Sequence, residues 1–443
     1  MKRYSRHICL LLIVFILFAI NAHAGEDGFK GLSLAQAIKR ALSNNPSILF
    51  RKALIDAAKK EKQAQWGAHL PRIDVVGEAY RTRYPSAITP ISGPGNFPHF
   101  SKDAYLYSLN LELPIYEGGR ILKRVKVADL ETSIRRSLER ETAHDIIANI
   151  KNTFYLTLYL RALIKAQQEA INALKKEYKD AELRLKLQKI APLDLLRIKT
   201  QLRAEEAALK ASKESLRRAK QAIAVLMGDP PRDDFVVLGE LSKKPFLPPK
   251  KVDEERFISF RPDIKAAEKR VEKALEGVSL AWREHLPSLN LFSSYGRKAG
   301  SGLHHDEDLW EIGLKLQFNI YSGGTISAEV EKARAELFST QEELRQKRLS
   351  AKQQIEAAMS KLIETNAQIQ RYKSARQTAK EAYRVESLRY KTGAGTVTDM
   401  LLSQSAWLNA EADYLYALYR NHKANIDYEY ATGTIGMPWL AQE

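Results

Sequence analysis

The sequence predicts a mainly α-helical protein with a small β part, in which one structural plan occurs twice. Two long stretches, 120–191 and 325–392, contain neither proline nor glycine and carry apolar residues at helical spacing. Two shorter segments, 105–113 and 310–318, alternate apolar with polar residues as strands do. Short helices, strands and a long helix follow one another in the same order in both halves of the chain. We therefore expect an internal two-fold repeat.

Short matched segments align the two copies. Asn45-Pro46-Ser47-Ile48 corresponds to Arg261-Pro262-Asp263-Ile264, which lies 216 positions later. Tyr116-Glu117-Gly118-Gly119 corresponds to Tyr321-Ser322-Gly323-Gly324, which lies only 205 positions later. The difference falls in the Pro/Gly-rich segment 84–95 of the first copy, because loops change length at little cost. We interpret six residues of the Tyr-x-Gly-Gly segments as the switch from strand to helix: Tyr116, Gly118, Gly119, Tyr321, Gly323 and Gly324.

The N-terminus has the features of a cleavable secretory signal at 1–24. Basic residues precede an apolar run at 8–20, and Ala22-His23-Ala24 supplies the small residues that signal peptidase requires. The run is shorter than the roughly 18–20 residues of a membrane-spanning helix, and no later segment approaches that length. The only cysteine, Cys9, lies inside the signal, so we expect the exported chain to contain neither a disulfide nor a lipid-attached thiol.

After the signal, the two structural repeats are expected at 25–240 and 241–443. Each should contain short helices, one strand hairpin and one long helical hairpin, and the second should end in a C-terminal tail. At about 1.5 Å per residue, each longest helix would be on the order of 100 Å long. Gly228 and Gly433 stand where a C-cap glycine would end each returning helix. The strand hairpins are expected at 71–115 and 287–320, and the long helical hairpins at 118–228 and 323–433.

The charge is strongly basic. The chain has 70 Lys and Arg against 53 Asp and Glu, and loss of the three basic residues of the signal leaves +14. Export removes nucleic acid as a partner, so anionic lipid, anionic cargo or acidic proteins are the candidates. No Ser-His-Asp set, paired carboxylates or cysteine constellation can be assembled, and we therefore expect neither an enzyme nor a cofactor.

Four strands cannot close a barrel, and an open sheet edge in lipid costs several kcal/mol for each unpaired backbone group. We therefore expect a homotrimer, in which three copies supply a twelve-stranded transmembrane β-barrel. The long helices have only a narrow apolar stripe, so they should continue the barrel as a hollow α-helical cylinder. An alternative is a periplasmic coiled-coil scaffold or adaptor without a pore, which would leave the amphipathic strands without a role.

The alternation of the strands separates lipid-facing from pore-facing positions. Aromatic residues near the strand ends suit girdles at the membrane interfaces, although ordinary strand packing is the alternative. The polar positions should face the pore and tune its selectivity, although such residues are more often simply solvated. The girdle candidates are Tyr80, Tyr84, Tyr105, Tyr107, Tyr116, Tyr295, Trp310 and Tyr321, and the pore-facing candidates are Asn110, Glu112, Lys315 and Gln317.

The order of signal, strand hairpin, Tyr-x-Gly-Gly switch, long helix and glycine-closed return, occurring twice, resembles the TolC-like outer-membrane efflux or channel-tunnel proteins over the whole mature chain. The resemblance implies a trimeric exit duct in the outer membrane of a Gram-negative-type bacterium, with a belt formed by 230–252, the short helices and the C-terminal tail. It also implies a passive role in tripartite efflux or type I secretion. The partners would be a periplasmic adaptor and an inner-membrane transporter of the RND, ABC or MFS type.

Members of this family carry acidic residues near the closed periplasmic end of the tunnel. The segment 390–402 corresponds to that region and places Asp399 at the aperture, with Asp194 at the equivalent point of the first repeat. Leu402 stands where a second acidic ring would be expected. The alternative reading is helix capping: Thr396 precedes Asp399 by three residues, and Asp194 follows a proline at a helix start.

In the family, the tips of the helical hairpins meet the adaptor. The tip residues here are Lys189, Ile190 and Ala191 in the first repeat, and Gly393, Ala394, Gly395 and Thr396 in the second. The glycines fit a turn and lack the lysine of a phosphate-binding loop. The run His304-His305-Asp306-Glu307-Asp308 suggests metal binding, but it lies between strands, and adjacent side chains in a loop do not converge on an ion. We therefore expect no metal site.

Overall fold

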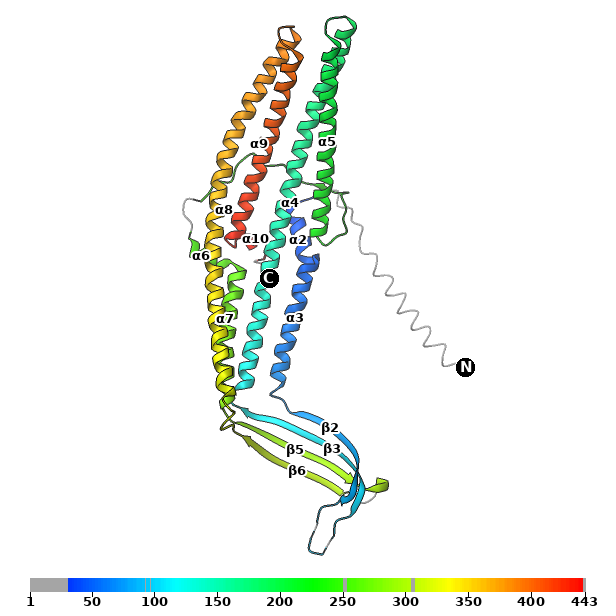
Figure 1. Cartoon of the computed structure of the whole chain (residues 1–443), viewed down its shortest axis with the longest axis vertical. Helices are drawn as coiled ribbons and strands as arrows, with labels where there is room; N and C mark the ends of the chain where they lie inside the picture. Colours follow the sequence, from blue (N-terminus) through cyan, green and yellow to red (C-terminus); the bar gives the residue numbers. More distant parts are fainter. Residues whose placement is uncertain (1–30, 92, 96, 250–252, 304–306, 441–443) are drawn as a thin grey trace, which may run out of the picture. The chain divides into compact units, whose positions relative to one another are not determined.

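The computed structural model describes residues 31–91, 93–95, 97–249, 253–303 and 307–440 (Figure 1). The expected signal, 1–24, lies outside them. The chain divides into two compact units, and each contains parts of both repeats. One, here the tip unit, holds the chain up to Asn45, Ile146–Pro249 and Met359–Tyr428; the other, here the sheet unit, holds Pro46–Asp145, Lys250–Ala358 and the chain from Glu429 onward.

Four long helices confirm the mainly helical fold. The two longest have 67 residues each and the two returning helices have 35 each. The boundaries of the two long helices in the second repeat lie 205 positions after those of their counterparts in the first, as the sequence alignment predicts. They are α4 (Arg120–Lys186), α5 (Pro192–Leu226), α8 (Thr325–Lys391) and α9 (Val397–Ala431). The described helices include none that is long and apolar enough to cross a bilayer.

Residues with a left-handed backbone end these helices. Gly228 and Gly433 follow α5 and α9 with φ of 85° and 70°, which confirms the C-cap prediction. At the tips, Gly393 has φ of 78°, and its counterpart in the first repeat, Gln188, also has a positive φ of 55°. The first tip therefore makes the same kind of turn without glycine, at a cost of about 1 kcal/mol.

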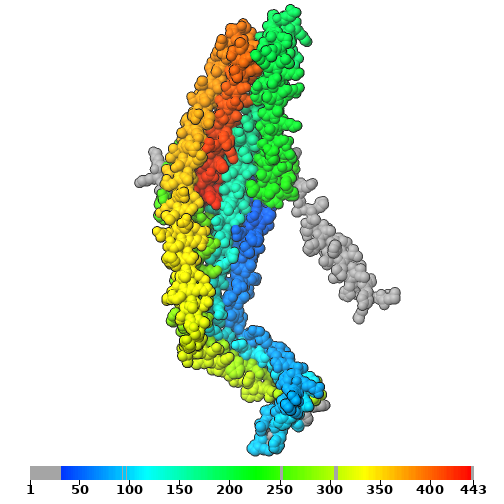
Figure 2. All heavy atoms as spheres, viewed as in Figure 1, coloured from blue at the N-terminus to red at the C-terminus, as the bar shows by residue number. Residues whose placement is uncertain are grey.

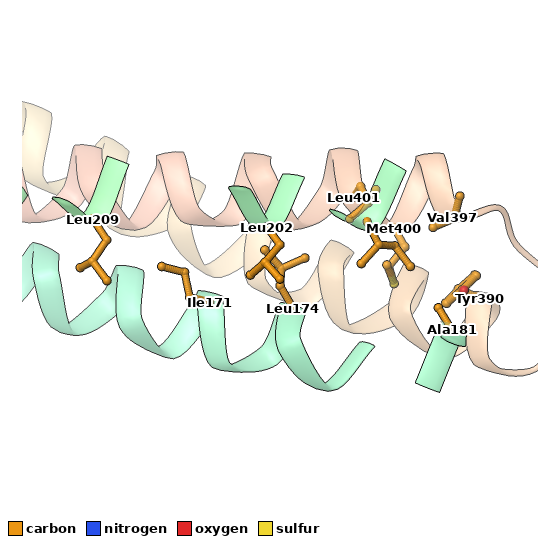
Figure 3. Close-up of a cluster of buried hydrophobic side chains, with 10 residues drawn as sticks. Ile171, Leu174, Ala181, Leu202, Leu209, Tyr390, Val397, Met400 and Leu401 are labelled. Atoms are coloured by element: carbon orange, nitrogen blue, oxygen red, sulfur yellow. The ribbon is translucent and has the colours of Figure 1, made fainter. Parts of the chain in front are cut away.

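The core of the tip unit lies between the two helical hairpins. Ile171 and Leu174 of α4 pack with Leu202 of α5 and with Tyr390 and Met400 of the second hairpin. Figure 3 shows these side chains pointing toward one another between the helices. Burial of one such aliphatic side chain stabilises the fold by about 1.5–3 kcal/mol, so this cluster joins the two hairpins near their tips.

Short elements surround the long helices. A capping box starts α2, because Ser33 accepts a hydrogen bond from the backbone of Gln36 while the Gln36 side chain accepts one from the backbone of Ser33. The short helices are α2 (Leu34–Asn44), α3 (Pro46–Gly67), α6 (Glu254–Phe260), α7 (Pro262–Trp282), η2 (Arg283–His285), η3 (Ser301–Leu303) and α10 (Met437–Leu440). Two-residue strands, β1 (Gly31–Leu32) and β4 (Val236–Val237), pair in parallel.

The segment 236–249, here called the strap, crosses helices of the tip unit. Arg161 of α4 donates a hydrogen bond to the carbonyl of Val237. Asn421 of α9 accepts from the backbone N–H of Phe246 at 2.7 Å and donates to its carbonyl at 3.3 Å. The ring of His422 is buried against the edge of the Phe246 ring, and burial lowers the pKa of His422. The strap thus occupies part of the expected belt at 230–252.

A buried arginine joins three helices of the sheet unit. Arg261, 6% exposed, forms a two-pronged ion pair with Asp263, with N–O distances of 3.0 and 2.8 Å. Its remaining nitrogen donates to Gln354 of α8 and to the carbonyl of Ala431 at the end of α9. Burial acts to raise the pKa of Asp263, but the hydrogen bonds and charge of Arg261 outweigh it and lower that pKa. The ion pair therefore stays charged at neutral pH.

We expect His144 to make the fold sensitive to mild acid. Burial lowers the pKa of His144 from 6.5 to about 4, whereas in the unfolded chain the ordinary value returns. The unfolded state therefore binds a proton first, and stability falls as pH drops from 6.5 to 4, by about 3 kcal/mol at most. Thermal unfolding in detergent between pH 7 and 4.5 should show a shallower decline for His144→Gln than for the exposed control His285→Gln. Equal declines would contradict this account.

Candidate functional site

Four strands of the sheet unit form one antiparallel sheet (Figure 1). They are β2 (Arg72–Ala87), β3 (Phe100–Glu117), β5 (Ser288–Ala299) and β6 (Glu307–Gln317), in the order β2-β3-β5-β6. The β3–β5 pairing joins the hairpins of the two repeats. On the face shown in Figure 2, the strands and their loops form a layer that no described helix covers. Within the described residues, β2 and β6 are the open edges of the sheet.

One face of the sheet is apolar and exposed. Val75 is 80% exposed, Trp310 72% and Leu316 69%. The register places these residues on the same face, because directly paired residues of neighbouring strands point to the same side. An apolar surface of this extent marks contact with a membrane or another protein. The large apolar residues of this face are Ile73, Val75, Tyr105, Tyr107, Leu109, Leu111, Leu113, Tyr116, Leu289, Leu291, Tyr295, Trp310, Ile312, Leu314 and Leu316.

The opposite face is polar, and the four expected pore-facing residues share it. Asn110 pairs with Asp74 and Ser294, and Glu112 pairs with Arg72. On the other hairpin, Lys315 pairs with Asn290 and Gln317 with Ser288. An ion pair of 2.8 Å between Arg72 and Asp74 adds to this face.

Phe292 is one of several large apolar residues on the polar face, together with Leu106 and Leu309. It pairs with Glu112 on one side and with Gly313 on the other. A Cβ atom at position 313 would lie 2.7 Å from the Phe292 ring, so the ring covers the glycine. Gly313 thus leaves room for the Phe292 ring on the polar face.

The register departs from strict alternation at one position and places one girdle candidate on the opposite face. A shift between Pro114 and Tyr116 places Tyr116 opposite Leu289 on the apolar face, whereas an unbroken alternation would turn it to the polar face. Tyr80 pairs with Ala104 and lies on the polar face, so the expectation that Tyr80 belongs to a lipid-facing girdle was wrong. Pro114 is the sequence signal for the bulge before Tyr116, because proline cannot donate to the ladder and occurs in sheets only at edges, strand starts or bulges.

The strand-to-helix switch requires its glycines in both repeats. Gly118, Gly119, Gly323 and Gly324 all have positive φ, between 61° and 80°. In the first repeat, a Cβ on Gly118 would lie 2.8 Å from the Leu286 side chain. In the second repeat, no described atom lies within 4 Å of such a Cβ, and the neighbouring Tyr321 is 85% exposed. The two switches thus share a backbone shape and differ in how they are covered.

The first switch is also held by charge. Arg120 donates to a carboxylate oxygen of Glu117 and to one of Glu284, both at 2.6 Å. Arg283 donates to the carbonyl of Gly118 at 2.8 Å. These bonds fix the angle at which β3 passes into α4.

At the second tip, Asp399 takes part in a helix cap. The hydroxyl of Thr396 accepts a hydrogen bond from the N–H of Asp399 at 3.1 Å and donates to its carboxylate at 2.7 Å. The capping alternative is therefore confirmed as a description of the geometry. Asp399 is exposed, and Leu402, where a second acid was considered, is 65% exposed.

Asp194 occupies the equivalent place at the first tip. It is the third residue of α5, after Pro192, and its N–H donates to the carbonyl of Ala191 at 3.0 Å. Its carboxylate lies 3.9 Å from Arg197, a weaker ion pair than a direct contact. Both acids thus sit at helix starts, where the helix dipole favours negative charge.

Most of the tip residues are available on the surface. Lys189, Ala191, Gly393, Ala394 and Thr396 are exposed. Ile190 instead packs partly against the core of the tip unit, and Gly395 is half-buried.

Polar links between the two hairpins lie behind the tips. Arg197 of α5 donates to the hydroxyl of Thr398 of α9 at 2.7 Å. Lys391 pairs with Glu177 at 3.1 Å, and the Arg184 guanidinium lies 5.4 Å from the centre of the Tyr390 ring. Sequence reasoning missed these links, because they depend on how the hairpins pack and leave no local pattern.

The metal hypothesis concerned 304–308, of which 304–306 lie outside the described residues. The Asp308 carboxylate forms an ion pair with Arg297 at 2.5 Å and accepts a hydrogen bond from the Tyr295 hydroxyl at 3.2 Å. Across the part of the chain that the structure describes, no three His, Cys, Asp or Glu side chains gather in a way that could hold an ion.

Comparison with known proteins connects this architecture to a family. The sequence profile described as "Outer membrane efflux protein" matches residues 37–229 and 256–434. The probable efflux pump outer membrane protein TtgC of Pseudomonas putida is 19% identical over 396 residues, which cover 88% of this chain and 81% of TtgC. Nodulation protein T of Rhizobium leguminosarum bv. trifolii is 23% identical over 272 residues, which cover 59% of this chain and 56% of that protein.

Solved structures show the same fold. The CmeC outer membrane channel of Campylobacter jejuni has a TM-score of 0.77 at 19% identity, and the match covers 90% of this chain and 85% of that chain. The two parts of the profile match together span most of the sequence, including both long helical hairpins. The chain therefore belongs to the outer membrane efflux protein family.

Proposed function

We propose that this protein is the passive outer-membrane exit duct of a tripartite efflux or type I secretion system, assembled from three copies. The observation that carries the proposal is the amphipathic sheet with two open edges, β2 and β6. In hydrocarbon, each unpaired N–H or C=O at those edges costs several kcal/mol. Pairing β6 of one copy with β2 of the next removes the cost, and three copies give a closed, even-numbered barrel.

The two faces of the sheet then have distinct surroundings. The exposed apolar face meets lipid, and the polar face with Asn110, Glu112, Lys315 and Gln317 lines water. The strand-to-helix switch of the second repeat, which is exposed at Gly323 and Tyr321, would be covered by a neighbouring copy. A periplasmic scaffold would leave the apolar face in water, where an exposed surface of that size promotes aggregation.

The helical part completes the duct and supplies the partner contacts. The long helices carry a narrow buried stripe and are polar elsewhere, so side-by-side packing encloses a wet tunnel. The exposed tip residues suit contact with a periplasmic adaptor, which would deliver cargo from an inner-membrane transporter. Transport through such a duct needs no catalysis by this chain.

Cysteine variants at two adjacent positions of β6 test which face of the sheet lines the pore. Glu311→Cys lies on the polar face and Ile312→Cys on the apolar face of β6. Because the only native cysteine is Cys9, each variant has a single reactive thiol after signal cleavage. In planar bilayers, a charged, membrane-impermeant thiol reagent should change the current of Glu311→Cys and leave Ile312→Cys unaltered. The absence of a channel, or equal modification of both, would contradict the proposal.

Asp399 is proposed to constrict the periplasmic mouth, because three copies bring three such carboxylates toward one axis. Asp399→Ala should raise the resting conductance and weaken block by divalent cations. Thr396→Ala is the matched control, since it removes the cap hydroxyl and retains the carboxylate, at a stability cost of about 1 kcal/mol. Identical single-channel behaviour of the two variants would show that Asp399 acts only as a cap.

A further inference from the structure

A cavity of about 530 Å³ in the tip unit has no role in the proposed duct. It lies where the strap meets α4, α8 and α9, and side chains of all four segments line it. Its volume falls within the range of sites that hold small organic molecules.

The floor of the cavity is apolar and partly aromatic. Leu415 and Leu418 of α9 are 8% and 1% exposed, and Leu158 of α4 is 4% exposed. Trp407 also lines the cavity, and its indole stacks on Tyr383 with 5.4 Å between ring centres. The indole N–H is buried and has no hydrogen-bond partner among the described residues. A buried donor without a partner is costly, and a ligand oxygen in the cavity could accept its hydrogen bond.

The rim of the cavity is positively charged. Five basic and three acidic side chains line it, which leaves a net charge of +2. Arg376 is already paired with Glu411 at 2.5 Å, and Arg161 donates to the strap. Lys243 of the strap and Lys380 of α8 are exposed and form no ion pair within the described part of the chain. Lys165 of α4 is likewise exposed and forms no ion pair in that part of the chain, so three cations above an apolar floor remain available to a ligand.

We propose that this cavity binds a small amphiphilic anion, of the class of aromatic carboxylates and sulfonates. The ring would lie on the leucine floor beside Trp407, and the anionic group would pair with Lys243 and Lys380. Desolvation of the ring supplies most of the binding free energy, and the lysines select the charge. The proposal concerns the tip unit alone and does not depend on the oligomer or on the conducting state of the duct.

The test uses 2-naphthoate as the probe and the full mature protein in lipid nanodiscs, with empty nanodiscs as the reference. Isothermal titration calorimetry should show one saturable site per chain with a Kd on the order of 1 mM, as expected for a ligand of this size. The double variant Lys243→Glu/Lys380→Glu should bind at least tenfold more weakly. The matched control Lys210→Glu/Lys213→Glu makes the same charge change on exposed positions of α5 outside the cavity and should bind as the wild type does.

Two further measurements separate charge from ring binding. The neutral analogue 2-naphthamide should bind the wild type at least tenfold more weakly than 2-naphthoate. Trp407→Phe keeps an aromatic ring on the floor of the cavity but removes the indole N–H. This variant should bind 2-naphthoate several-fold more weakly than the wild type. The proposal is overturned if the wild type shows no saturable binding, or if the two double variants lose affinity equally. Because the titration measures binding to the tip unit and does not measure conduction, a negative result here does not contradict the proposed duct.

Discussion

Replacing Leu314 with arginine is expected to abolish stable insertion into the outer membrane. Leu314 is 62% exposed on the apolar face and pairs with Leu291. An arginine facing hydrocarbon costs about 2–4 kcal/mol per copy, and every copy of a ring carries it. The fraction of protein recovered in washed outer membranes, together with the amount of heat-labile oligomer on a gel, measures the effect.

Gln317→Arg is the control for this prediction. It introduces the same side chain three residues away on the polar face, where the structure pairs Gln317 with Ser288. We expect it to insert normally and to change only the ion selectivity. If Leu314→Arg is recovered in the outer membrane to the same extent as Gln317→Arg, the apolar face does not contact lipid.

Arg261→Met is expected to destabilise the fold by about 3–5 kcal/mol, the cost of breaking a buried ion pair from one side. The change leaves Asp263 half-buried without its partner and removes the bond to the carbonyl of Ala431. It should appear as a large drop in the thermal unfolding temperature in detergent. The double variant Arg261→Met/Asp263→Leu should recover much of that loss, because it leaves no unpaired charge. A double variant no more stable than the single one would show that the bonds to Gln354 and Ala431 matter more than the charge.

The sequence was sufficient to predict the fold class because the strongest signals were long and occurred twice. Absence of proline and glycine predicts the long helices, and the aligned repeats predict that α4 and α8 begin 205 positions apart, as observed. The period-two alternation placed Asn110, Glu112, Lys315 and Gln317 on one face of the sheet. Each of these inferences depends on many residues at once.

Features that depend on a few residues, or on packing between distant segments, could not be predicted. The pairing of β1 with β4 involves two residues on each side, which is too short for any pattern. The turn at Gln188 uses a conformation that normally favours glycine, and only its counterpart Gly393 hints at it. The buried position of Arg261 follows from contacts with α8 and the end of α9, far away in sequence. The cap at Asp399 was predictable because its partner lies three residues away.

Cross-linking between the open edges of the sheet tests the central claim most directly. Val75→Cys in β2 is combined in turn with a cysteine at each position from 309 to 316 in β6, and oxidised membranes are analysed on a denaturing gel. A disulfide requires Cα atoms within about 7 Å, so only one or two neighbouring registers should react. We predict that those registers give covalent species that stop at three chains. No cross-linking at any register, or a ladder that continues past three, would contradict a ring of three copies closed by their strand edges.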